Sequence, residues 1–118
     1  MKTEASTIRG RFNRLAAQLA VSSITFAELA YGVEKSGRRQ ANVDTLQALI
    51  ARLDVLPFHA KAAQHFGEIR AELERSGTPV GPFDMLIGAH ARAEGLIVVT
   101  DNVREFERIP GLVVENWL

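Results

Sequence analysis

Apolar residues recur at helical spacing in some segments of the chain and form short continuous runs in others. Ile8, Phe12 and Leu15 are three or four residues apart, which predicts a helix over about residues 6–18. The run LIVVT near the C-terminal end is short and β-branched, as is typical of a buried strand. The same reasoning predicts helices over 25–34, around 43–53, over 60–75, over 83–93 and at 104–107, and strands over 20–23, 55–58, 96–100 and 111–116.

Glycine and proline residues mark the ends of several of these elements. Gly77 is expected to end the long helix that begins near Ala60, and Pro57 indicates that the strand around it is short or lies at an edge. Because strands alternate with helices, the sequence predicts an α/β fold in which a parallel sheet is flanked by helices on both faces. The length fits one domain over residues 1–118, without repeats or linkers.

Composition and charge exclude several kinds of protein. Hydrophobic residues make up 47% of the chain, which is enough for a core. The 14 basic and 14 acidic residues give zero net charge, so a polyanionic partner would be bound by a local patch. Without cysteine there are neither disulfides nor thiolate metal sites. The sequence has no run of 18 apolar residues and no signal-peptide pattern, so we expect a cytoplasmic protein that does not bind membranes.

Three acidic residues are placed where an α/β fold binds ligands. In parallel sheets, ligands bind outside the carboxyl ends of the strands. Glu28 follows the strand AVSS by five residues, and Asp101 directly follows LIVVT. Asp84 is expected in the first turn of its helix. The three carboxylates are therefore predicted to meet on one rim.

Each acid also has a purely structural interpretation. Thr25 and Glu28 match a capping box, in which the glutamate bonds back to the helix start. Asp84 can favour the positive end of its helix. Asp101 and Asn102 are typical of turns and of helix N-caps. Taken one at a time, these interpretations compete with a functional one.

Crowding favours a shared role for the acids. Two carboxylates about 4 Å apart repel each other by up to about 4 kcal/mol at an effective dielectric constant of 20, which exceeds the gain from one cap or dipole contact. A divalent cation removes this conflict. Oxygen ligands suit Mg²⁺ or Mn²⁺, ions that keep several waters and bridge substrate phosphates.

The segments that carry these acids resemble a known family. SSITFAEL with Glu28, GTPVGPFDMLIGAHA with Asp84, GLIVVTDNVREFERIPGL with Asp101 and the closing VENWL resemble the VapC-type toxins of the PIN-domain ribonucleases, over essentially the whole chain. The resemblance implies a PIN-like three-layer sandwich and an Mg²⁺-dependent endoribonuclease toxin of a type II toxin–antitoxin system, with RNA, including tRNA, as substrate. It also implies a VapB-like antitoxin as partner and a homodimer.

The family's acids carry over by position. Glu28 and Asp84 match the second and third acids that hold Mg²⁺ in the family, as catalytic and metal-binding residues. The fourth acid falls in the turn of Thr100, Asp101 and Asn102. Asp101 is favoured as the ionised member, with Thr100 and Asn102 as substrate-positioning residues.

One part of the family pattern has no counterpart in this sequence. VapC-type chains usually open with an apolar strand that ends in the first acid and lies in the centre of the sheet, and this sequence starts inside the helix that follows. The strand LIVVT would then face an unpaired neighbour position, and weak folding without RNase activity is expected. The alternative function is therefore a catalytically inactive, truncated PIN module that only binds antitoxin or dimerises.

Other features of the sequence are less specific. Arg92 and Arg104 are expected to flank the rim, where they can hold RNA phosphates, and Lys35, Arg38 and Arg39 form a small basic cluster. Solvated faces explain the same residues. The three histidines lack the spacing of a metal motif. A phosphoacceptor receiver-type domain also has an acidic-edged parallel sheet, but the Asp and following Lys that it requires are not found.

Overall fold

The structure is a computed structural model that describes residues 10, 12, 14 and 19–117. The strands and helices expected from residue 20 onward are present with slightly shifted bounds. Most of the helix expected over 6–18 lies outside the described residues, although Gly10, Phe12 and Arg14 are helical. The elements in chain order are β1 (Ala20–Ser22), α2 (Ser23–Lys35), α3 (Arg39–Ile50), β2 (Asp54–Leu56), α4 (Ala60–Ser76), α5 (Pro82–Glu94), β3 (Ile97–Val99), α6 (Val103–Phe106) and β4 (Val113–Glu115).

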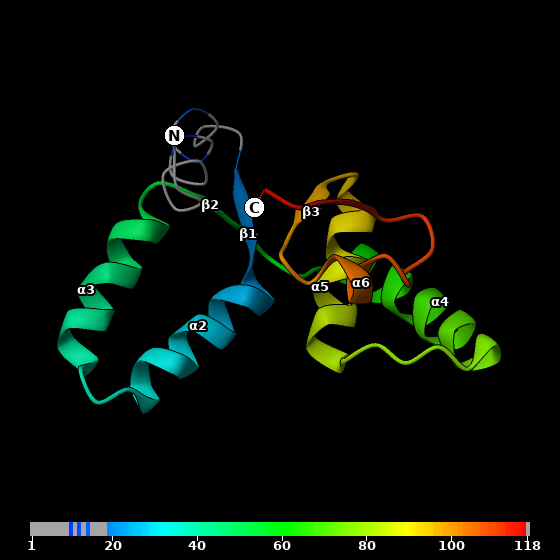
Figure 1. Ribbon diagram of the computed structural model, residues 1–118, viewed down its shortest axis with the longest axis horizontal. Helices are drawn as coiled ribbons and strands as arrows, with labels where there is room; N and C mark the ends of the chain where they lie inside the picture. The colour runs from blue at the N-terminus through cyan, green and yellow to red at the C-terminus, as the bar shows by residue number, and fades with distance from the viewer. Residues whose placement is uncertain (1–9, 11, 13, 15–18, 118) are drawn as a thin grey trace.

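The strands form parallel pairs flanked by helices, which confirms the expected α/β class. β1 pairs with β2, with Ala20 opposite Asp54, and β3 pairs with β4, with Ile97 opposite Val113. Among the described residues these are two separate two-stranded sheets, whereas we expected a single sheet. In Figure 1 the first pair lies beside α2 and α3, and β3 lies on the side of α4, α5 and α6.

A groove of about 520 Å³ separates the two strand pairs. Val21 of β1 lines one wall, Ile97 and Val99 of β3 line the other, and Ile87 and His90 of α5 form part of the lining. The edges of β1 and β3 that face this groove have no strand partner in the described part of the chain. The single-sheet prediction was wrong for the described residues because no strand joins these two edges.

The hydrophobic core lies where α4 and α5 pack against β3 and α6. Burial of such apolar surface is the main source of folding stability. By contrast, α2 and α3 contain no fully buried residue. The core is made of Ile69 and Leu73 from α4, Met85 and Ala89 from α5, Val98 from β3, Phe106 from α6 and the following Ile109.

Two glycines end the core helices, and the end at Gly77 was predicted. Gly77 follows α4 with φ of 65°, and Gly95 follows α5 with φ of 67°. This left-handed conformation carries no steric penalty for glycine and closes the last helical turn. The Thr78 amide donates to the carbonyl of Leu73 at 2.9 Å, which completes the cap of α4. Pro82 is the first residue of α5, a position where proline costs no hydrogen bond.

The start of α2 differs from the expectation. Ser22 is the N-cap, and its hydroxyl accepts a hydrogen bond from the Ile24 amide at 3.1 Å. The helix therefore begins at Ser23, and Thr25 lies inside its first turn and is not the N-cap. The capping-box interpretation of Thr25 and Glu28 was therefore wrong. A serine directly before the helix satisfies the same orphan amides. Glu28 is left without a capping role.

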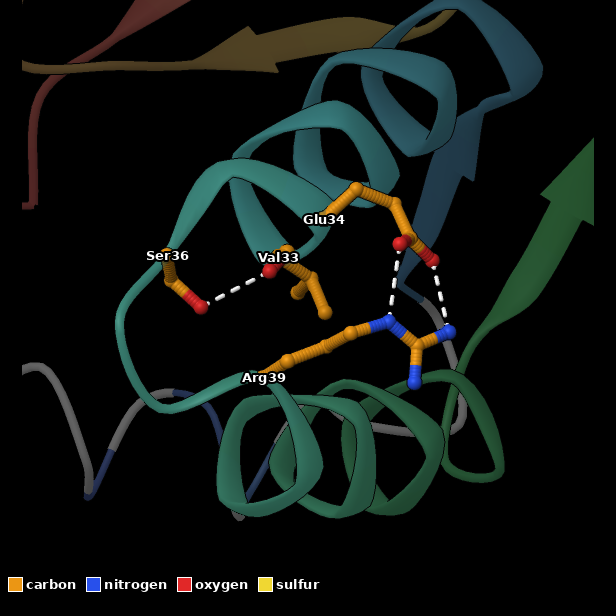
Figure 2. A network of polar contacts seen from close by, with 4 residues as sticks. All are labelled: Val33, Glu34, Ser36 and Arg39. Atoms are coloured by element: carbon orange, nitrogen blue, oxygen red, sulfur yellow. Dashed lines mark hydrogen bonds and ion pairs between the residues drawn. The ribbon is translucent and has the colours of Figure 1, made fainter.

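The turn between α2 and α3 is held by side-chain contacts (Figure 2). Arg39 makes two hydrogen bonds of 2.8 Å to the carboxylate of Glu34, and the Ser36 hydroxyl donates to the Val33 carbonyl at 2.7 Å. The hydrogen bond from Arg39 holds the pKa of Glu34 below its usual range. Arg39, one of the three members of the basic cluster, is thus engaged with an acid.

No described helix is long and apolar enough to cross a membrane.

Candidate active site

Asp84 is the centre of the acidic site. It lies in the first turn of α5, which has no side-chain N-cap, and its side chain is half-buried. Burial raises the pKa of Asp84 to about 6, and a hydrogen bond to Glu105 together with the charges of Glu105 and Glu28 acts in the same direction. Like charges and desolvation both favour the protonated form of a carboxyl group. Asp84 therefore has the kind of perturbed pKa that clusters at functional sites.

Glu105 of α6 is the acid that contacts Asp84. The Gly81 amide donates to its Oε1 at 2.6 Å, and the Asn102 side-chain amide donates to its Oε2 at 2.7 Å. These bonds, with the one to Asp84, lower the pKa of Glu105, and the bond from Gly81 is the largest cause. Asp84 and Glu105 thus interact directly, and below about pH 6 the proton of the pair lies on Asp84 while Glu105 is ionised.

Glu28 is the third acid of the group. It lies on the exposed face of α2, and its charge contributes to the raised pKa of Asp84. Glu28 acts on Asp84 through its charge, without a hydrogen bond between the two. The structure therefore places Asp84 and Glu105 in direct contact and adds the charge of Glu28, an acid expected from the sequence, to the same site.

The turn after β3 places its three candidate residues differently. Asp101 is exposed and makes no hydrogen bond or ion pair with the described part of the chain. The Asn102 side chain faces Glu105, and the Asn102 backbone amide donates to the Thr100 hydroxyl at 3.0 Å. Of the two neighbours in this turn, Asn102 is thus the one connected to the acidic pair.

Sequence reasoning missed Glu105. It follows Asn102 by three residues at the start of a short helix, and this is the spacing at which an N-cap residue and an N3 glutamate meet. That signal was available, but it indicates only a local cap. The contact with Gly81, 24 residues earlier, depends on tertiary structure.

Arg92 takes a different position from the one expected. Arg92 lies in the last turn of α5, about 12 Å along the helix from Asp84 at 1.5 Å per residue. Its guanidinium bonds to His65 (2.9 Å), the Pro110 carbonyl (3.0 Å) and Glu68 (3.0 Å), so it ties α4 and α5 to the turn before β4 and not to the rim.

Two other arginines lie beside the acids. Arg104 is exposed on α6, next to Glu105. Arg108 is exposed one turn later, its charge acts on Glu105, and it donates to the Pro79 carbonyl at 2.7 Å. These cations are placed where a bound phosphate could be contacted from the α6 side.

The buried histidine has a structural contact. His90 is 3% exposed, its Nδ1 lies 2.8 Å from the Ser22 hydroxyl, and its ring packs edge-on against Phe58. Burial lowers the pKa of His90. Neutral His90 therefore joins α5 to the end of β1, which is a structural role.

The acidic pair fits a hard divalent cation. Within residues 10, 12, 14 and 19–117 no group of three or more His, Asp or Glu side chains is close enough to hold an ion. Mg²⁺, however, commonly binds through one or two carboxylates and keeps several waters. Asp84 and Glu105 provide two such carboxyl groups. A cation that replaces the proton on Asp84 would relieve the repulsion between the two carboxylates.

Comparison with known proteins identifies the family. The model of the PIN domain matches residues 2–112. The tRNA(fMet)-specific endonuclease VapC of Shigella flexneri is 49% identical over 117 residues, which are 99% of this chain and 89% of that protein. The ribonuclease VapC of Haemophilus influenzae is 49% identical over 111 residues, 94% of this chain and 84% of that protein.

A solved structure gives the same result for the fold. The VapBC complex of Salmonella typhimurium bound to DNA superposes with a TM-score of 0.92 at 52% identity, over 95% of this chain and 85% of that chain. The chain therefore belongs to the PIN-domain family and is one of its VapC-type members.

Proposed function

We propose that Asp84, Glu105 and Glu28 are the acidic groups with which this VapC-type endoribonuclease hydrolyses RNA. The observation that supports this most strongly is the contact of Asp84 and Glu105 at the N-terminus of α5, where the Gly81 amide and the Asn102 side chain hold the Glu105 carboxylate in place. The structure gives Asp101 no contact with this pair. We therefore give Glu105, rather than Asp101, the place of the fourth acid.

The chemistry follows from the charges in the site. Asp84 and Glu105 would hold Mg²⁺ or Mn²⁺, which activates water and stabilises the charge that develops on the phosphate. Glu28 adds negative charge from the opposite helix and strengthens the attraction for a cation. The proton on Asp84 has to leave before the cation binds, so we expect metal affinity to rise with pH through about 6.

The proposed substrate is tRNA. Two curated relatives, from Shigella flexneri and Salmonella typhimurium, carry the name tRNA(fMet)-specific endonuclease and are 49% and 50% identical to this chain. Arg104 and Arg108 border the acidic pair and are the candidate phosphate contacts. We expect their neutralisation to weaken RNA binding and to reduce its salt dependence.

The proposed partner is a VapB-like antitoxin encoded beside this protein. Solved neighbours from Salmonella typhimurium and Rickettsia felis are VapBC complexes. An arginine of such a partner, placed among the three acids, would make charge-assisted hydrogen bonds and compete with the cation. We propose that binding inhibits cleavage, that the toxin itself forms a homodimer, and that it acts in the cytoplasm.

The test is cleavage of labelled tRNA by the purified chain with Mg²⁺ or Mn²⁺. Asp84→Asn and Glu105→Gln should each lose more activity than the roughly 10- to 100-fold that changes to outer-shell partners cost. Glu107→Gln is the matched control, because this acid is exposed two residues from Glu105. Asp101→Asn should have a small effect.

Three results would contradict the proposal. If Asp84→Asn cleaves RNA normally, Asp84 serves only its helix end. If the wild-type chain binds antitoxin but does not cleave tRNA with either cation, the chain is the inactive binding module. Loss of activity in Asp101→Asn but not in Glu105→Gln would return the fourth position to Asp101.

A further inference from the structure

Asn102 is held in place by the end of the second strand pair. The Thr100 amide donates to the Glu115 carbonyl at 3.0 Å, which fixes the start of the turn to β4. The Thr100 hydroxyl in turn accepts a hydrogen bond from the Asn102 backbone amide at 3.0 Å. The backbone of Asn102, the N-cap residue of α6, is therefore held in place by the β3–β4 pair.

The side chain of Asn102 is directed at Glu105. Its Nδ2 donates to Oε2 at 2.7 Å, while the Gly81 amide donates to Oε1 at 2.6 Å. Each carboxylate oxygen of Glu105 thus has a donor of its own, and Asp84 makes a third contact. Charge-assisted bonds of this length are among the stronger hydrogen bonds in proteins.

We infer that Asn102 is a positioning residue that acts through Glu105, and that it holds this carboxylate against the start of α5 and beside Asp84. The catalytic part of this inference rests on the proposed function. The sequence had assigned Asn102 to the substrate, but its amide is already bonded to Glu105. A free Glu side chain has several rotamers, so fixing it in one reduces what the site must order when it binds a cation.

The identity of residue 102 follows from the same geometry. An asparagine offers an uncharged donor to a carboxylate. An aspartate at this position would offer only acceptors and a second negative charge, which repels Glu105. Asn102→Asp should therefore displace Glu105 more than Asn102→Ala does, although aspartate is closer to asparagine in shape.

The first experiment reads the position of Glu105 without metal or RNA. The Gly81 amide proton is bonded to Glu105, so its NMR chemical shift and exchange rate report that contact. Asn102→Ala and Asn102→Asp should shift this resonance and speed its exchange. Asp101→Ala is the control, because this neighbour makes no such contact. An unchanged Gly81 signal in both Asn102 variants would overturn the inference.

The second experiment separates positioning from substrate contact. Asn102→Ala should lower kcat about 10- to 100-fold, as the loss of outer-shell partners does, with little change in KM for tRNA. A raised KM at unchanged kcat would instead mean that Asn102 contacts RNA, and would overturn the inference.

An exchange variant tests the pair as a unit. Combining Asn102→Asp with Glu105→Gln swaps donor and acceptor and keeps the number of charges. The double variant should be more active than the product of the two single effects predicts, because the hydrogen bond is restored in reverse. Additive losses would contradict the pairing.

The two proposals fail in different ways. If the Gly81 signal responds as expected but no variant and no wild-type protein cleaves RNA, the positioning role stands and the proposed function fails. If Asp84→Asn abolishes cleavage while Asn102→Ala changes neither the Gly81 signal nor kcat, the proposed function stands and the positioning role fails.

Discussion

The proton on Asp84 links the acidic site to stability. The pKa of Asp84 is about 6 in the folded protein and about 3.9 in an unfolded chain. Between these values the folded state binds the proton and the unfolded state does not, so stability falls as pH rises through this window. The lowered pKa of Glu105 acts in the opposite sense, since its contribution is lost as pH falls.

Asp84→Asn should therefore remove the decrease in stability between about pH 4 and 6. Without metal at pH 7, the variant should be as stable as the wild type or more stable, because one charge of the pair is gone. Urea midpoints measured at pH 4.5 and pH 7 for both proteins check this. An identical pH dependence in the two would mean that Asp84 is not the group that holds the proton.

Gly88 is a second residue with a definite prediction. A Cβ added there would clash with Cδ1 of Ile109, which is 2% exposed, and would lie 3.4 Å from Cδ2 of Leu112. Gly88→Ala should destabilise the protein by about 1–3 kcal/mol through overpacking. Gly67, also inside a helix but with nothing within 4 Å, is the control.

Gly67→Ala should instead stabilise the protein by up to about 1 kcal/mol, because alanine has the higher helix propensity. Denaturation curves should therefore show a lower free energy of unfolding for Gly88→Ala and a higher one for Gly67→Ala. Equal effects would mean that helix α5 can move away from Ile109 at little cost.

Individual residues also show how far the sequence could predict the site. Asp84 and Glu28 could be named as candidates because strand ends and helix starts can be read from hydrophobic patterns. Glu105 was missed because its importance depends on the Gly81 amide, 24 residues away, and on the path of the chain between them. Arg92 was misplaced for a related reason: the sequence does not show that the end of α5 packs on the turn at Pro110.

Elements were predicted better than their ends. The glycine stops at Gly77 and the alternation of helices and strands follow from local chemistry, and the structure confirms them. The start of α2 was wrong because Ser22, Ser23 and Thr25 all have hydroxyl groups that can cap a helix. Tertiary contacts help to distinguish among them: the Ser22 hydroxyl bonds to His90, and the Ser23 hydroxyl accepts from the Phe58 amide.

Ser22 therefore gives a test of the element boundary. Ser22→Ala removes the N-cap of α2 and the polar partner of buried His90, so it should cost about 1–2 kcal/mol of stability. Thr25→Ala should cost much less, because Thr25 lies within the helix. Thermal or urea denaturation of both variants measures the difference. A larger loss in Thr25→Ala would restore the cap to Thr25.

At the scale of the whole molecule, exposed strand edges line the groove between the two strand pairs. Ile97 and Val99 of β3 are 49% and 42% exposed and line this groove. Parallel strands are normally buried on both faces, and flat apolar edges promote association. The expectation of an unpaired neighbour beside LIVVT agrees with this arrangement in the described residues.

We expect this edge to make the 118-residue chain self-associate at high concentration. Ile97→Lys should reduce association, because a charged side chain on an edge opposes strand pairing. Val113→Lys is the control: Val113 is 58% exposed on β4 but does not line the groove. Light scattering over a concentration series gives the comparison. Equal reduction by both variants would mean that general charge, and not this edge, controls association.

The spacing of the two strand pairs also sets an order of assembly. Partners in β3 and β4 are 16 residues apart, with only α6 between them, whereas partners in β1 and β2 are 34 residues apart. Each doubling of loop length adds about 0.6 kcal/mol to the entropy lost on closure, and β3–β4 also adjoins the core. The segment that carries Asp84, Asn102 and Glu105 should thus form early in folding, before α2 delivers Glu28. A full-length chain that refolds would form its acidic pair first and bring its third charge to the site last.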